Sequence, residues 1–209
     1  MTGRRRSRRA GRSARTRRAP RTTRPRPPRR LPVALTGTPG VGKSAVAGRL
    51  ARRWRVVEVA ELARRYGAAR GTGRSVEVDL ARLRKALRSR AARDGVDVIV
   101  GHLAHLLPVR AAIVLRCHPR ELARRLARAR RGSATDRRAN FVSEALDLVL
   151  AEAAGAGLPV FEVDTTGRSV GAVAREVELR LRCGGPPRHG VVDWLADRSV
   201  TAHLLDAPG

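Results

Sequence analysis

The chain has 209 residues, enough for one domain with added segments, and it contains 45 Lys and Arg against 18 Asp and Glu. Residues 1–30 hold 14 arginines, no acidic residue and no large apolar residue after Met1. Such a segment cannot bury enough surface to fold, so we expect a disordered basic arm followed by one packed domain.

Composition also excludes several classes of protein. The longest apolar stretch, residues 111–115, is far shorter than the roughly 18–20 residues that span a bilayer, and the arm lacks the apolar run of a secretory signal. Cys117 and Cys183 form neither a disulfide framework nor a metal-binding pattern, which favours the reducing cytoplasm. The five aromatic residues are too scattered to form a platform for stacking nucleic-acid bases.

From Leu31 onward, short apolar runs alternate with helical patterns. Their length and their Gly, Pro or Asp boundaries predict buried parallel strands at residues 33–36, 56–59, 96–100, 112–116 and 160–163. Apolar residues at helical spacing predict helices around residues 46–54, 80–87, 119–126, 142–150 and 170–181. This alternation predicts an α/β fold with a five-stranded parallel sheet flanked by helices.

Two polar segments do not fit the sheet. Residues 64–75 are Gly-rich and residues 128–138 are dense in arginine, and we expect both to be mobile loops. Residues 184–209 begin with Gly and Pro and read as a C-terminal tail. The predicted organisation is therefore an arm (1–30), a domain (31–183) and a tail (184–209).

Residues 37–44 read Gly-Thr-Pro-Gly-Val-Gly-Lys-Ser and match the phosphate-loop pattern G-x-x-x-x-G-K-[ST]. The glycines allow backbone N–H groups to surround an anion, and the following helix directs its positive end at the phosphates. Lys43 supplies a cation for the β- and γ-phosphates, and the Ser44 hydroxyl is a typical Mg²⁺ ligand. The predicted strand before the loop and the helix after it argue against a chance turn.

The phosphate loop alone does not define the reaction. No N-K-x-D segment is present to read guanine, which argues against a GTPase, and the domain is small for a motor ATPase. Two basic loops on a compact sheet fit a nucleotide kinase, which must close over two phosphate-bearing substrates and exclude water.

Several further motifs occur in one order along the chain: residues 59–63 (VAELA), 101–106 (GHLAHL), 115–119 (LRCHP), 143–146 (SEAL) after Asn140, 162–169 (EVDTTGRS) and 192–195 (VDWL). Together with the phosphate loop they resemble the archaeal branch of the adenylate kinase isoenzyme 6 family. The resemblance covers residues 31–195. It implies a P-loop NTPase fold, ATP and AMP as substrates with Mg²⁺, and a role in small-ribosomal-subunit maturation with a ribosomal protein and rRNA as partners.

The resemblance also implies site residues. The ATP phosphates would lie on Gly40, Gly42, Lys43, Ser44 and Ala45, the monophosphate-binding segment would span residues 58–78, and the lid would span 129–139. The family's catalytic, ATP-contacting lid arginine lies ten residues before the asparagine, which here is Arg130. One inserted residue leaves Arg128 and Arg131 as alternatives. The turn at residues 164–167 would lie near the adenine.

The chain departs from the family at one position. Family members often carry an acid two residues before the third-strand histidine, acting through water on Mg²⁺, and this chain has Val100 there. Asp97 lies at the wrong end of the strand. Either phosphoryl transfer is slow without this acid, or Glu77 or Asp79 substitutes for it.

His102 is a candidate catalytic residue that positions water or phosphate. His102 and His105 are three residues apart, so both could bind one metal ion on a helix. The sequence shows no third ligand, which argues against such a metal site. Cys117 follows a buried strand, and because no motif activates it we expect an inert core thiol.

Three hypotheses account for the arm. It binds rRNA nonspecifically through phosphate contacts, or it is a targeting extension, or its start is mis-assigned and translation begins near Leu31. Two functions remain for the domain. One is an adenylate kinase that converts ATP and AMP into two ADP, and the other is a ribosome-assembly ATPase with incidental kinase activity.

Overall fold

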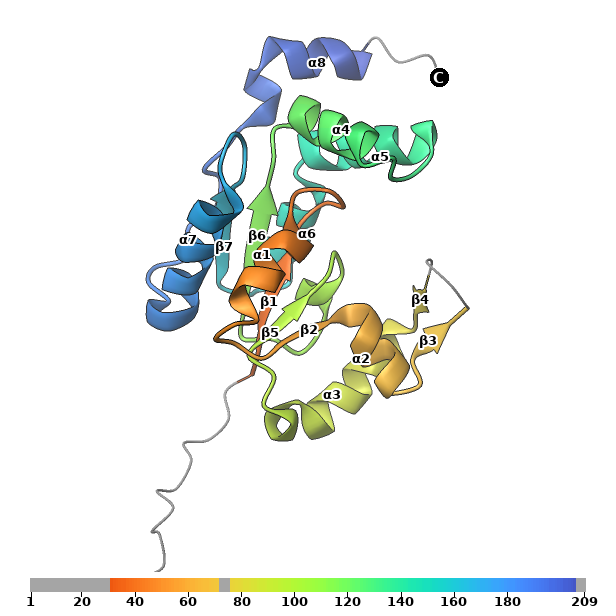
Figure 1. The fold of residues 1–209 in the computed structure, drawn as a ribbon, viewed down its shortest axis with the longest axis vertical. Helices are drawn as coiled ribbons and strands as arrows, with labels where there is room; N and C mark the ends of the chain where they lie inside the picture. Colours follow the sequence, from red (N-terminus) through yellow and green to blue (C-terminus); the bar gives the residue numbers. More distant parts are fainter. Residues whose placement is uncertain (1–30, 72–75, 206–209) are drawn as a thin grey trace, which may run out of the picture.

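The computed structural model describes residues 31–71 and 76–205 (Figure 1). The expected arm, residues 72–75 of the expected monophosphate-binding segment and residues 206–209 of the expected tail lie outside the described residues. Within the described part of the chain, no helix is long and apolar enough to cross a membrane.

Five parallel strands form the central sheet, and each predicted strand supplies one of them. In chain order they are β1 (Val33–Thr36), β2 (Val56–Glu58), β5 (Val98–Val100), β6 (Ala111–Arg116) and β7 (Val160–Asp164). Their order in space is β2-β5-β1-β6-β7, which places β1 between β5 and β6. The predicted α/β fold with a five-stranded parallel sheet is therefore confirmed.

Helices cover both faces of this sheet, because successive strand side chains point to opposite sides. Val33 and Leu35 of β1 join one core cluster, while Ala34 joins the cluster on the other face. The first face is covered by α1 (Lys43–Leu50), α4 (Pro119–Arg128) and α7 (Val170–Cys183), and the second by α2 (Val59–Arg65), α3 (Leu80–Asp94), the 3₁₀ helix η1 (Ala104–Leu106) and α6 (Leu148–Gly155). Burial on both faces explains why the strands read as continuous apolar runs.

The two predicted loops contain more regular structure than expected. Within the first lies β3 (Ala69–Arg70), which pairs antiparallel with β4 (Glu77–Val78), just after the loop, in a small separate sheet. In the second, α5 (Ala134–Ala145) begins directly after Ser133, whose side chain accepts a hydrogen bond from Asp136 N while the Asp136 carboxylate accepts one from Ser133 N. This capping box starts the helix inside the expected lid, so only residues 129–133 form its irregular part.

The helix predicted around residues 142–150 is interrupted. α5 ends at Ala145 and α6 begins at Leu148, and between them Asp147 has a left-handed backbone with φ of 57°. The Asp147 carboxylate accepts a hydrogen bond from the buried Arg116 guanidinium, which holds the chain at this turn. Apolar spacing continues across the break, so the periodicity of the sequence alone does not reveal it.

The described part of the expected tail folds back onto the domain. Its backbone at Arg188 exchanges hydrogen bonds of 2.8 and 2.9 Å with β7. The 3₁₀ helix η2 (Trp194–Ala196) and the helix α8 (Arg198–Leu205) follow. Trp194 and Val200 pack against Phe141 of α5 in a third buried cluster, so this segment is a docked element beside the expected lid (Figure 1).

Candidate active site

The loop between β1 and α1 has the backbone that the phosphate-loop pattern requires. Gly37, Gly40 and Gly42 have φ values of 130°, 98° and 112°, which L side chains rarely adopt. A Cβ on Gly37 would also lie 2.3 Å from the carbonyl oxygen of Leu115, so only glycine fits there. Gly42 is the N-cap of α1, and the positive end of that helix therefore faces the hollow of the loop.

Lys43 folds back over this loop. Its Nζ donates hydrogen bonds to the carbonyl oxygens of Gly37 at 2.6 Å and Thr38 at 2.9 Å. Burial lowers the pKa of Lys43 to about 8, and the nearby carboxylate of Glu144 opposes that shift. The ammonium group is thus held inside the loop by two carbonyl dipoles, which phosphate oxygens can replace.

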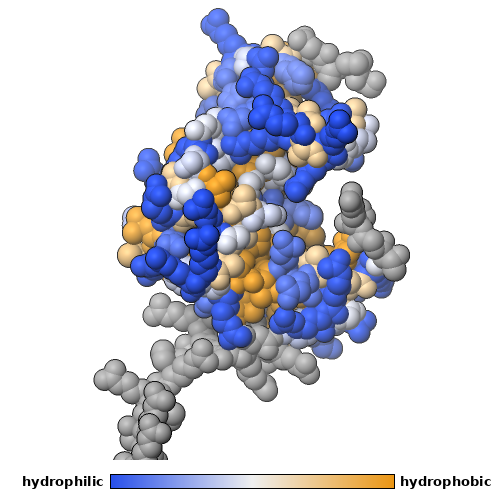
Figure 2. All heavy atoms as spheres, in the orientation of Figure 1, coloured by the Kyte–Doolittle hydropathy of each residue, from blue (hydrophilic) through white to orange (hydrophobic). Residues whose placement is uncertain are grey.

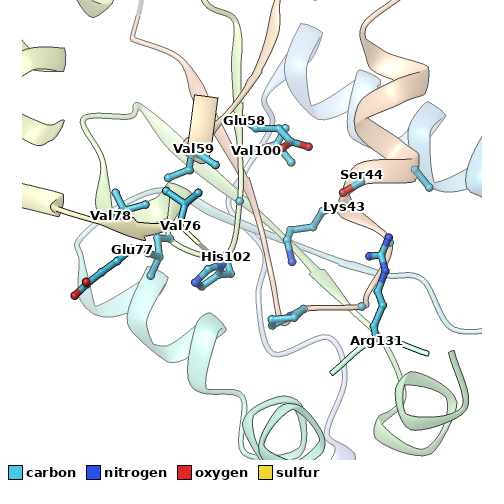
Figure 3. Close-up of a pocket in the computed structure, with 17 residues that line it drawn as sticks. Lys43, Ser44, Glu58, Val59, Val76, Glu77, Val78, Val100, His102 and Arg131 are labelled. Carbon is cyan, nitrogen blue, oxygen red and sulfur yellow. The ribbon is translucent and has the colours of Figure 1, made fainter. Parts of the chain in front are cut away.

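A cleft of about 680 Å³ opens beside the loop. Figure 2 shows the molecule indented between the part that carries α4 and α5 and the part that carries α2, β3 and β4. Loop residues, strand ends and the β4 segment meet in it, and they include Gly40, Gly42, Lys43, Ser44, Ala45, Glu58, Glu77, Val100, His102 and Arg131 (Figure 3). The structure therefore gathers the five predicted phosphate-loop residues and His102 in one cleft with part of the expected monophosphate-binding segment.

His102 lines this cleft and keeps an exposed surface. Burial, followed by the charge of Lys43, lowers its pKa, so the ring is neutral at pH 7. His105 faces elsewhere: its Nδ1 lies 3.0 Å from Thr36 Oγ1 and its Nε2 lies 3.2 Å from Glu152 Oε2. Both ring nitrogens of His105 thus have polar neighbours, and the described residues contain no group of three or more His, Cys, Asp or Glu that could hold a metal ion.

Among the lid arginines, the structure places Arg131 on the cleft wall. Its guanidinium points toward the loop that carries Lys43 and Ser44 (Figure 3), and its backbone N donates a 3.0 Å hydrogen bond to Leu126 O. Arg130 does not line the cleft and has a left-handed φ of 49°. The one-residue insertion thus favours Arg131, which the sequence left as an alternative.

A smaller cavity of about 320 Å³ lies on the other side of the loop. Its walls are mostly apolar, from Val41, Val46, Val170 and Val173, with Arg125, Thr165 and Arg168 at its polar edge. Arg125 donates hydrogen bonds to Thr165 Oγ1 at 3.1 Å and Thr165 O at 2.9 Å, which fixes the turn at residues 164–167 beside the loop. The family resemblance implied that the adenine lies near this turn.

The acidic residues considered for Mg²⁺ occupy different places. Val100 is apolar and buried at the end of β5, as the sequence indicated, and Asp97 lies at the other end of that strand. Asp79 is the N-cap of α3. Glu77 and Glu58 both line the cleft. Glu58 was not considered from the sequence, where it is the third residue of the strand predicted at 56–59.

No pattern in the sequence predicted the buried network of polar side chains behind the loop. Thr38, Arg116, Glu144 and Glu162 are all buried, and Arg116 donates to Glu144 Oε1 and Glu162 Oε1 at 2.8 Å each. Cys117 lies beside it with no exposed surface, and burial raises the pKa of its thiol to about 12, as expected for an inert thiol.

Comparison with known proteins places these features in a family. Residues 33–147 match the family described as AAA domain. A protein of Thermococcus onnurineus named "Putative adenylate kinase" is 37% identical over 175 residues, which cover 83% of this chain and 96% of that protein. A protein of Archaeoglobus fulgidus with the same name is 39% identical over 171 residues, which cover 79% of this chain and 92% of the relative.

Among solved structures, a gluconokinase from Sinorhizobium meliloti 1021 aligns with a TM-score of 0.45 and 19% identity, over 73% of this chain and 93% of that chain. The sequence matches are the stronger finding, since they span nearly the whole of each relative. The chain belongs to the P-loop family that these archaeal adenylate kinase relatives form.

Proposed function

We propose that the protein is an adenylate kinase that transfers the γ-phosphoryl group of ATP to AMP and yields two ADP. The observation that carries the proposal is the single cleft in which the phosphate loop faces residues of β2, α2 and β4. A nucleotide kinase needs two phosphate-bearing substrates side by side, and a cleft with a loop on one wall and a second segment on the other can hold both. The names of the archaeal relatives support the same reaction.

In this proposal the ATP phosphates lie against the backbone N–H groups of Gly40, Gly42 and Ala45 and against the side chains of Lys43 and Ser44. Lys43 exchanges its two carbonyl partners for β- and γ-phosphate oxygens. The adenine enters the smaller cavity beside Thr165. The residues present also fit Mg²⁺, because the Ser44 hydroxyl opens into the cleft next to Lys43. When bound, Mg²⁺ neutralises charge on the phosphate oxygens.

AMP occupies the wall that residues 58–60 and 76–78 of the expected monophosphate-binding segment form. An oxygen of its phosphate attacks the γ-phosphorus in line, the bond between that phosphorus and the β–γ bridging oxygen breaks, and ADP leaves from each side. Neutral His102 holds a phosphate oxygen or a water by a hydrogen bond. The segment 129–139 closes over the phosphates as a lid, and Arg131, or Arg130 in its place, neutralises the charge that moves.

The test is product analysis with ATP and each nucleoside monophosphate in turn. We expect ADP to form from ATP and AMP in a ratio of two ADP for each AMP consumed. ATP turnover that releases phosphate at a rate independent of AMP would overturn the proposal and favour the ATPase alternative. The cytoplasmic location stays a prediction.

A role in small-subunit maturation, with a ribosomal protein and rRNA as partners, also stays a prediction. The names of the two relatives describe an adenylate kinase and mention no ribosomal role. Co-sedimentation of the full chain with pre-small-subunit particles would support this role, and its absence at low salt would contradict it.

A further inference from the structure

P-loop enzymes hold Mg²⁺ with the loop Ser or Thr and with an acidic residue that reaches it from the end of a strand. Carboxyl ends of parallel strands meet at one edge of the sheet, so the candidates are the residues that end β2, β5, β6 and β7. The two strands that flank β1 offer no free acid: β5 ends in Val100, and β6 ends in Arg116.

Glu58 ends the next strand. β2 pairs parallel with β5, and Glu58 lies directly opposite Val100 in that register. Both residues line the cleft, and in Figure 3 the Glu58 carboxylate projects beside Val100 toward the loop that carries Lys43 and Ser44.

The Glu58 carboxylate is also free to accept a ligand. Glu58 is the N-cap of α2, yet its side chain makes no capping hydrogen bond. Among the described residues it has no hydrogen bond or ion pair at all. This exposed acid therefore has no partner among the residues that the structure describes, and it lies on a cleft that Lys43 and Arg131 also line.

The other acids near the site either point away from the phosphate loop or already accept hydrogen bonds. The Glu77 carboxylate points away from Lys43 and Ser44 (Figure 3). Asp79 accepts a 3.0 Å hydrogen bond from Arg82 N at the start of α3. Asp164 at the end of β7 accepts hydrogen bonds from Thr166 N and Oγ1 at 2.8 and 2.6 Å.

We infer that Glu58 would supply a carboxylate that holds the Mg²⁺ of bound ATP through a water, together with the Ser44 hydroxyl. The inference rests on the proposed function, because it assumes ATP in the phosphate loop. Neighbouring strands lie about 4.8 Å apart, and Mg²⁺ keeps several of its waters in proteins, so a water bridges the added distance from β2. The longer side chain of Glu reaches further toward the metal than Asp would.

The experiment measures metal affinity directly. Mn²⁺ replaces Mg²⁺, and the electron paramagnetic resonance signal of free Mn²⁺ gives its dissociation constant in the complex of the full chain with a non-hydrolysable ATP analogue. Glu58→Gln is expected to weaken Mn²⁺ binding by about 10–100-fold. Affinity for the analogue in EDTA should change by less than about twofold, since the backbone cradle and Lys43 are untouched.

Two variants serve as controls. Glu61→Gln removes an equal charge from α2, where Glu61 pairs with Arg65, and should leave Mn²⁺ affinity unchanged. Glu77→Gln should also leave it unchanged, and a loss there with none in Glu58→Gln would assign the role to Glu77. Unaltered Mn²⁺ affinity of Glu58→Gln, in a wild-type protein that phosphorylates AMP, would overturn this inference alone. A wild-type protein that binds no ATP analogue would overturn the proposed function as well.

Discussion

Thr38 at the tip of the phosphate loop donates a hydrogen bond of 2.5 Å from Oγ1 to Oε2 of Glu144, which lies 106 residues further along the chain. The other Glu144 oxygen accepts from Arg116 Nε at 2.8 Å and Cys117 N at 3.0 Å. Arg116 Nη1 also donates a 2.8 Å hydrogen bond to Oε1 of Glu162 in β7. The shape of the loop therefore depends on a buried carboxylate in α5, the helix that also carries much of the proposed lid.

Removal of the Glu144 carboxylate should destabilise the fold strongly. Glu144→Ala leaves the buried Arg116 guanidinium with one partner fewer, and breaking a buried ion pair in this way costs about 3–5 kcal/mol. Glu176→Ala is the control, because Glu176 pairs with Arg168 at the surface and such pairs contribute about 1 kcal/mol or less. Chemical denaturation of both variants measures the two values, and equal losses would contradict a structural role for the network.

Lys43→Ala tests the loop as the catalytic site. The change removes a preorganised cation from the phosphates, so the rate of phosphoryl transfer should fall by about 10²–10³-fold. Lys85 on α3 is the only other lysine of the chain, and Lys85→Ala should keep the wild-type rate. Near-normal transfer by Lys43→Ala would show that this loop does not perform the chemistry.

The lowered pKa of Lys43 predicts a pH dependence of nucleotide binding. Burial brings that pKa to about 8, so the loop loses its charge as pH rises through about 8. Bound phosphate favours the protonated amine, and binding above this pH must take up a proton. ATP affinity should therefore fall above pH 8, by at most about tenfold per pH unit.

Titrations of a fluorescent ATP analogue between pH 7.5 and 9.5 measure this fall. Lys43→Arg supplies the control, because the guanidinium stays charged over the whole range. An equal fall in Lys43→Arg would mean that another group titrates.

The lid prediction separates two neighbouring arginines. Arg131 faces the cleft, so Arg131→Ala should lower kcat by about 10²-fold and weaken ATP binding much less, since the contact forms chiefly in the closed state. Arg130→Ala should lower kcat by a clearly smaller factor. Steady-state kinetics of both variants measure these two losses of kcat. A larger loss in Arg130→Ala than in Arg131→Ala would make Arg130 the lid arginine.

The central sheet and the loop were predictable because their signals are local. Each strand is one apolar run, and the loop is an eight-residue pattern between a strand and a helix. The arginine that lines the cleft was harder to predict, since one inserted residue shifts the register and only the folded loop shows which guanidinium faces the cleft.

Long-range contacts account for what the sequence did not reveal. The break at Asp147 depends on Arg116, and Arg116 was read only as the end of a strand. Glu58 became a candidate only when the strand register placed it beside Val100. Trp194 and Val200 were assigned to a tail because the residues that they pack against, in α5, lie far from them in the sequence.

Incubation of the protein with ADP and Mg²⁺ alone tests the central claim most directly. An adenylate kinase runs its reaction backward under these conditions, so ATP and AMP should appear in equal amounts, and Lys43→Ala should form neither at a comparable rate. A hydrolase cannot make ATP from ADP. Formation of AMP and phosphate without ATP, or no reaction by a protein that hydrolyses ATP, would contradict the proposed function.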